Sequence, residues 1–245
     1  MLKLLSVELL KIRRSLALLM MFGIPLLVIL LNAAMLAKQH DMHQITEKIW
    51  FFYWAGNTGM WCYFMMPLYI ALITGLLNGH EHKNQTWRLM LTLPVSQLEL
   101  FIVKGVLALL FVVGATLVLV AGTALTVFMF AACGASLDGA FAAPLAPMVW
   151  KVTLACLPVL VIQHAVSWRF QNLVLPLAVG VIATMGITQI GSSKYWAWYP
   201  WTYSMMGLHG SDVANQEKAL LLAALVGAGL FAACALVLGR REVES

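Results

Sequence analysis

Residues 103–133 read VKGVLALLFVVGATLVLVAGTALTVFMFAAC, with Lys104 as the single charged side chain. A helix rises about 1.5 Å per residue, so about 20 apolar residues cross the hydrocarbon of a bilayer. The apolar residues are continuous and do not alternate with period two, which favours a helix over a strand of a β-barrel. The stretch therefore predicts a membrane-spanning helix that is longer than a span requires.

Further apolar runs of this kind occur on both sides of it. The whole chain of 245 residues is 62% hydrophobic and 10% charged, whereas soluble domains carry about 25% charged residues. We therefore expect one all-α, polytopic membrane domain over residues 1–245. Its six predicted transmembrane helices are Ser15–Leu36, Met60–Leu77, Val103–Cys133, Val149–Trp168, Leu173–Ile190 and Ala219–Leu238.

The basic residues predict the orientation of these helices. They fall into alternating segments, ten on one side and five on the other, and all six arginines belong to the larger group. The positive-inside rule places that group, and both termini, in the cytoplasm. The net charge of +5 is then explained by retention next to anionic lipid, without a nucleic-acid partner. The larger group is Lys3, Lys11, Arg13, Arg14, Lys83, Arg88, Lys104, Arg169, Arg240 and Arg241, and the smaller is Lys38, Lys48, Lys151, Lys194 and Lys218.

Residues 1–14 precede the first span and have the pattern of an amphipathic helix. Leu2, Leu5, Leu9 and Ile12 recur at helical spacing, with basic residues between them. One interpretation is an interfacial elbow helix that lies along the membrane. The alternative is a simple basic anchor for the first span.

The segment 79–102, between the second and third spans, combines charge with an apolar middle. Trp87, Leu91 and Leu93 occur close together, although a loop exposed only to solvent would not need apolar residues. Pro94 is expected to stop a short helix, and Ser96 to cap the helix that leads into the third span. The segment is predicted to present a short helix to a cytoplasmic partner, or else to lie on the membrane surface.

This segment, together with the start of the chain, resembles the membrane subunits, or permeases, of ABC type-2 transporters. The resemblance rests on the basic start VELLKIRRS and on the run E-H-K-N-Q-T-W-R-L-M-L-T-L-P-V-S, followed by a lysine. The family often has a basic residue after the serine, where this chain has Gln97. The Thr-Trp pair and Pro200-Trp201 are similar to the branch of lantibiotic and bacitracin immunity permeases. The matching positions are Glu81, Thr86, Trp87, Leu91, Leu93, Pro94, Ser96 and Lys104.

The resemblance implies that the membrane path and the ATP site belong to different subunits. In such permeases the loop after the second span is a coupling helix, seated in a separate ABC-type ATPase that holds ATP and Mg. The sequence contains no phosphate-binding loop of its own, so no cofactor and no catalytic residue is expected on this chain. A second permease copy or a sibling permease is implied as a further partner. The resemblance also implies a bacterial plasma (inner) membrane and an outward-moving amphipathic substrate.

Residues 191–218 form a segment on the predicted outer side with six aromatics in nine positions. One interpretation is an aromatic belt at the membrane surface. The other is an outer gate or substrate contact, because similar permeases place short re-entrant helices here. The aromatics are Tyr195, Trp196, Trp198, Tyr199, Trp201 and Tyr203.

Other side chains suggest no chemistry of their own. His40 and His43 share a helical spacing, but a polar turn explains them better than a metal site. His164, inside the fourth span, is expected to make an interhelical hydrogen bond. No acidic residue lies deep in a predicted span, which disfavours proton- or sodium-driven transport. An ATP-driven exporter subunit and a non-transporting membrane anchor or sensor remain as alternatives, with a membrane-embedded enzyme third.

Overall fold

The computed structural model describes residues 2–12, 15–83, 96–142, 145–170 and 172–243. Helices account for 86% of the structure, which confirms the predicted all-α fold. The elements are α1 Leu2–Ile12, α2 Leu16–Gln39, η1 Met42–Gln44, α3 Glu47–Met60, η2 Trp61–Met65, α4 Met66–Lys83, α6 Gln97–Ala132, α7 Leu145–Ala155, α8 Leu157–Arg169, α9 Val174–Ile190, η3 Trp196–Trp198, η4 Pro200–Thr202, α10 Tyr203–His209 and α11 Val213–Val243.

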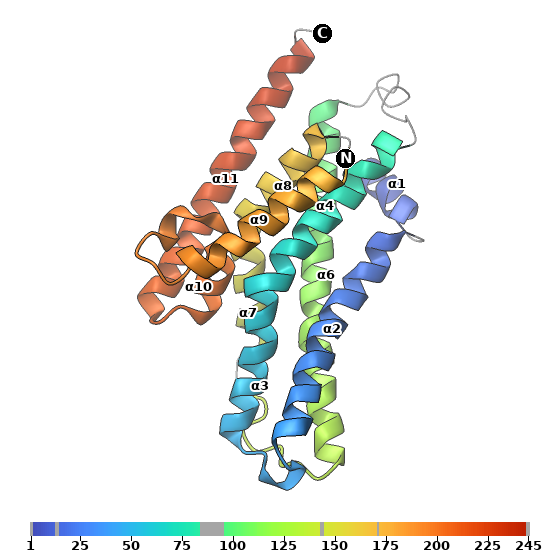
Figure 1. Cartoon of the computed structure of the whole chain (residues 1–245). Coiled ribbons are helices and arrows are strands. Elements are labelled where there is room, and N and C mark those ends of the chain that lie inside the picture. The colour runs from blue at the N-terminus through green and yellow to red at the C-terminus, as the bar shows by residue number, and fades with distance from the viewer. Residues whose placement is uncertain (1, 13–14, 84–95, 143–144, 171, 244–245) are drawn as a thin grey trace.

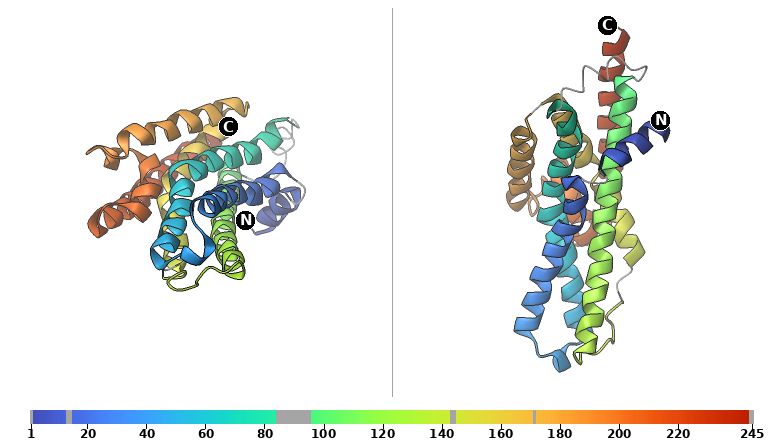
Figure 2. Two further views of the ribbon diagram at one scale, coloured as in Figure 1. Left: turned by 60° about the horizontal axis from the view of Figure 1, so that its bottom comes forward. Right: turned by 90° about the vertical axis from the view of Figure 1, so that its right-hand side faces the viewer.

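The long helices run roughly along one direction (Figure 1). The helices α2, α3–α4 and α6 form the elongated body, and α8 and α9 pack against α4. Figure 2 shows α4 between α6 on one side and α9 on the other. The short helix α1 lies across one end of the body and contacts α6. The chain therefore places α1 beside the residues on both sides of the segment 79–102.

The number of spans differs from the six that we predicted. Within the described residues, four helices are long and apolar enough to cross a membrane, namely 16–39, 47–79, 97–132 and 213–239. The helices α7 and α8 qualify as a fifth only if they are counted together across a bend of 42°. The helix α9 is apolar but has only 17 residues. The six-span count is thus not confirmed, and four or five spans are supported.

A proline explains the break in the predicted span Val149–Trp168. Cys156 separates α7 from α8, and Pro158 occupies the first turn of α8. Proline has no N–H to donate, and its ring crowds the carbonyl four residues earlier. The first turn of a helix tolerates proline because its N–H groups lack helical partners there. The run therefore forms two bent helices.

The second span begins earlier than predicted because polar aromatics extend it. The helix α3 starts after Thr46, well before Met60. Its indole groups bind the segment that follows α6, since Trp50 Nε1 donates to the Ser136 carbonyl and Trp54 Nε1 to the Ala140 carbonyl, each at 2.8 Å. The span continues through η2, one stretch of π-helix, into α4.

The helix ends gather at two opposite ends of the body. The starts of α1 and α6 and the ends of α4, α8 and α11 lie toward the upper end of Figure 1. The described members of the larger basic group belong to helices at these ends, namely Lys3, Lys11, Lys83, Lys104, Arg169, Arg240 and Arg241. The end of α2 and the start of α3 lie at the opposite end. The assignment of the basic end to the cytoplasm stays a prediction.

Candidate functional site

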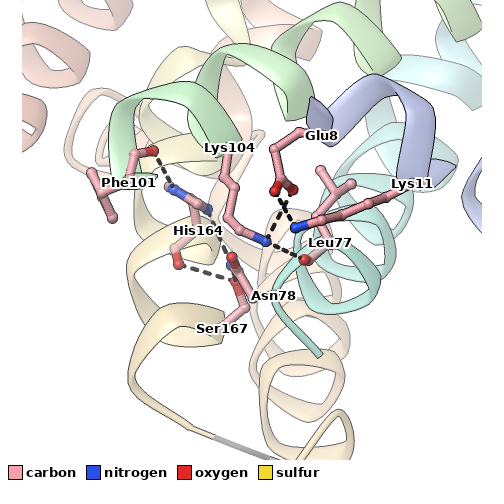
Figure 3. A network of polar contacts seen from close by, with 8 residues as sticks. All are labelled: Glu8, Lys11, Leu77, Asn78, Phe101, Lys104, His164 and Ser167. Carbon is pink, nitrogen blue, oxygen red and sulfur yellow. Dashed lines mark hydrogen bonds and ion pairs between the residues drawn. The ribbon is translucent and has the colours of Figure 1, made fainter. Parts of the chain in front are cut away.

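A buried ion pair joins α1 to the start of α6. The Lys104 side chain is 1% exposed, and its Nζ lies 3.6 Å from Glu8 Oε2 (Figure 3). The same ammonium donates to the carbonyl of Leu77 in α4 at 2.7 Å. The other oxygen of Glu8 pairs with Lys11, which is 43% exposed. One lysine thus connects three helices at the end of the body where the segment 79–102 leaves and returns.

A second set of polar contacts lies next to this pair and adds α8 to it. One nitrogen of the His164 ring lies 3.2 Å from Asn78 Nδ2, and the other lies 3.0 Å from the carbonyl of Phe101. Asn78 also donates to the hydroxyl of Ser167 at 2.6 Å. The imidazole therefore bridges α4 and α6, and the predicted interhelical hydrogen bond of His164 is confirmed (Figure 3).

These two sets, which we call the polar network, comprise Glu8, Lys11, Leu77, Asn78, Phe101, Lys104, His164 and Ser167. Buried polar groups hold a fixed geometry because each lost partner leaves a desolvated group unsatisfied. The network joins α4 just before the segment 79–102 to α6 just after it. It can therefore keep the two ends of that segment at a fixed spacing.

The structure places only part of the predicted partner-contact set. The backbone of Glu81 belongs to α4, and the side chain of Ser96 caps α6 by accepting from the N–H of Glu99 at 3.0 Å. Lys104 faces the interior of the protein, and its predicted role in coupling to an ATPase stays a prediction. The remaining predicted residues lie outside the described part of the chain, namely Thr86, Trp87, Leu91, Leu93 and Pro94.

Glu8 and Asn78 were not singled out from the sequence. Glu8 lies between Leu5 and Ile12 on the inward side of α1, and it is buried whereas Leu9 is exposed. A carboxylate within the apolar stripe of an amphipathic helix was the available signal. Its partner Lys104 is remote in the sequence, and no local pattern indicates that the two meet.

The aromatic segment folds back against the body. The elements η3, η4 and α10 lie at about half the height of α3–α4 in Figure 1, short of the end where α2 and α3 meet. Trp196, Trp201 and Tyr203 are buried there, whereas Tyr195 and Trp198 are exposed. The predicted set of six, with Tyr199 half-buried, thus divides into a packed group and an open group.

The comparisons with known proteins agree with this architecture. The family model described as "ABC-2 family transporter protein" matches residues 4–187, about three quarters of the chain. The chain belongs to the ABC-2 transporter family. No curated protein and no solved structure was found to match the chain.

As an ABC-2 family protein, the chain is a multi-pass membrane protein and the membrane component of an ABC transporter. Permeases of this family work with an ABC ATPase. The matched residues 4–187 include every residue of the polar network and all of the segment 79–102. They end before the aromatic segment and α11, which the family match therefore does not describe.

Proposed function

We propose that this chain is the membrane subunit of an ATP-driven exporter, and that a separate ABC ATPase docks on the segment 79–102. The basic end of the helices is cytoplasmic in this proposal, so the segment meets the ATPase inside the cell. ATP and Mg bind to the partner. A second copy of the chain or a sibling permease completes the transporter in a bacterial inner membrane.

The observation that carries the proposal is the polar network at the base of this segment. A docked ATPase that moves the segment 79–102 would act on α4 and α6, whose ends Lys104 holds together. Glu8 and His164 connect the same ends to α1 and α8. A buried set of charged and polar contacts resists local distortion, which favours movement of these helices as one unit.

The direction and the substrate class are the remaining parts of the proposal. Outward movement of an amphipathic molecule, such as a peptide antibiotic or a lipid-like compound, is supported by the aromatic side chains that remain open on the outer segment. Tyr195 and Trp198 offer rigid contact area at low entropic cost. Immunity against such an antibiotic is the biological role implied by the branch that the Thr-Trp pair resembles.

The test is capture of the ATPase by the full chain. Trp87→Ala should weaken capture by about 1–3 kcal/mol, as for an interface anchor, while the amount of chain in the membrane stays the same. Trp150→Ala is the matched control, because Trp150 is an exposed tryptophan of α7. Equal capture of the ATPase by both variants would show that the segment 79–102 is a surface connection and not the docking site. Transport by the purified chain without an ATPase would refute the proposal.

A further inference from the structure

A cavity of about 220 Å³ lies between α3, α7 and α10. The apolar part of its lining includes Phe51, Trp54, Met148 and Leu208. Drug-sized ligands occupy sites of roughly 300–1,000 Å³. The smaller volume fits one chain or one headgroup of a ligand better than a bulky ring system.

The same lining also carries a cation with a neutral partner. Lys151 of α7 is half-buried, and its Nζ lies 3.1 Å from the amide oxygen of Gln216. Among the described residues no carboxylate forms an ion pair with it, and none lines the cavity. The neighbouring lysines differ, since Lys194 and Lys218 lie over the rings of tyrosine and tryptophan side chains.

A contact between a histidine and a threonine forms a second polar part of the lining. His209 of α10 lines the cavity, and its Nε2 lies 3.2 Å from the hydroxyl of Thr58. That hydroxyl donates its own hydrogen to the carbonyl of Trp54 at 2.8 Å. The imidazole therefore donates from Nε2 to Thr58, which fixes the ring at the cavity edge. With its Nε2–H bound to Thr58, the neutral ring has only an acceptor left at Nδ1, so the ammonium of Lys151 is the donor that the described lining offers to an anion, beside apolar surface.

A half-buried ammonium without a carboxylate partner is costly when empty and is stabilised by a bound anion. Two of the helices that form the cavity, α3 and α10, contact η2, the π-helical stretch of the second span. Single π-helical turns within longer helices occur often at functional sites. The charge of Lys151 and the apolar lining therefore both favour an anionic amphipath in this cavity.

We propose that the cavity binds a single-chain anionic amphipath, with its carboxylate or phosphate ester at Lys151 and its acyl chain along Phe51 and Trp54. This inference deepens the proposed function, because it names the class of molecule that the exporter handles at the outer segment. Binding itself needs no ATP, so it can be measured on the chain without its ATPase.

The test uses two photoreactive probes of equal length, a diazirine-bearing hexadecanoic acid and the matching alcohol. The full chain is purified into nanodiscs of phosphatidylcholine, irradiated with each probe and mapped by peptide mass spectrometry. The acid should label peptides with residues 51–58, 147–151 and 208–209 more strongly than the alcohol does. Lys151→Gln should lower labelling by the acid roughly tenfold or more, the loss expected for one charged hydrogen bond, and should leave labelling by the alcohol unchanged.

Two variants control for folding and for general charge effects. Lys151→Arg keeps the cation and should keep most of the labelling. Lys194→Gln removes an exposed cation of the segment 191–218, outside the cavity lining, and should change nothing. Equal labelling by acid and alcohol would overturn the proposal, as would equal losses in the two glutamine variants. A negative result leaves ATPase capture through Trp87 unaffected, so the two proposals fail separately.

Discussion

Replacing Glu8 by glutamine is the most direct test of the polar network. The variant keeps the size of the side chain and removes the negative charge that faces Lys104. The ammonium would then remain buried, with the carbonyl of Leu77 still beside it. Glu8→Gln should therefore destabilise the packing of α1 on α6, although Glu8 lies outside every predicted span.

The expected magnitude follows from the geometry of the pair. Charges 3.6 Å apart interact by about 4–5 kcal/mol at an effective dielectric constant of about 20. Removing one partner of a buried pair typically costs about 3–5 kcal/mol, because the other charge stays desolvated. Lys11 pairs with the same carboxylate from an exposed position, so Lys11→Gln should cost about 1 kcal/mol or less.

The free energy of unfolding of the full chain can be measured by steric trapping in micelles. The double variant Glu8→Gln/Lys104→Met should be less destabilised than the sum of the two single variants, because it removes both charges of the pair. Additive effects within about 0.5 kcal/mol would refute the argument. So would a Glu8→Gln effect no larger than that of Lys11→Gln.

Three further predictions concern packing, the aromatic segment and orientation. Gly180→Ala should cost about 1–3 kcal/mol because the added Cβ would clash with the Cβ of Ala71 in α4. Gly229→Ala meets nothing within 4 Å and should be neutral or stabilising in the same unfolding assay. Trp201→Leu should reduce the yield of folded protein because Trp201 is 7% exposed, whereas Trp198→Leu, at 85% exposed, should leave the yield unchanged in size-exclusion profiles. A cysteine at His43, in a chain without its native cysteines, should react with a membrane-impermeant reagent added outside intact cells, and labelling only after permeabilisation would contradict the orientation.

The apolar runs predicted helices well where one run forms one continuous helix. The helix α2 matches its predicted span closely, whereas α6 and α11 each begin six residues before their predicted starts. At Val149–Trp168 hydropathy does not register the break beside Pro158, where the run forms two bent helices that count as one span only together. It also missed the start of α3, where indole and hydroxyl groups lower the hydropathy while their hydrogen bonds stabilise the helix.

The site was harder to predict because its contacts are remote in the sequence. Lys104 follows a segment that resembles a docking loop, so its position suggested a contact with a partner. The structure pairs it with Glu8 and Leu77. Ser96 was predicted correctly because a helix cap depends on neighbours three residues away.

The location of the network indicates where movement can occur under the proposed function. Lys104 and His164 hold α1, α4, α6 and α8 together beside the segment 79–102, so relative movement there would break buried contacts. The other end of α4 continues into η2, whose π-helical hydrogen bonding differs from that of the helices around it. The helix α10, which forms part of the anion cavity, contacts η2. We therefore expect α4 to move as a rigid helix when the segment 79–102 moves, because the polar network resists distortion at that end. The movement would then reach η2 and, through α10, the wall of the cavity.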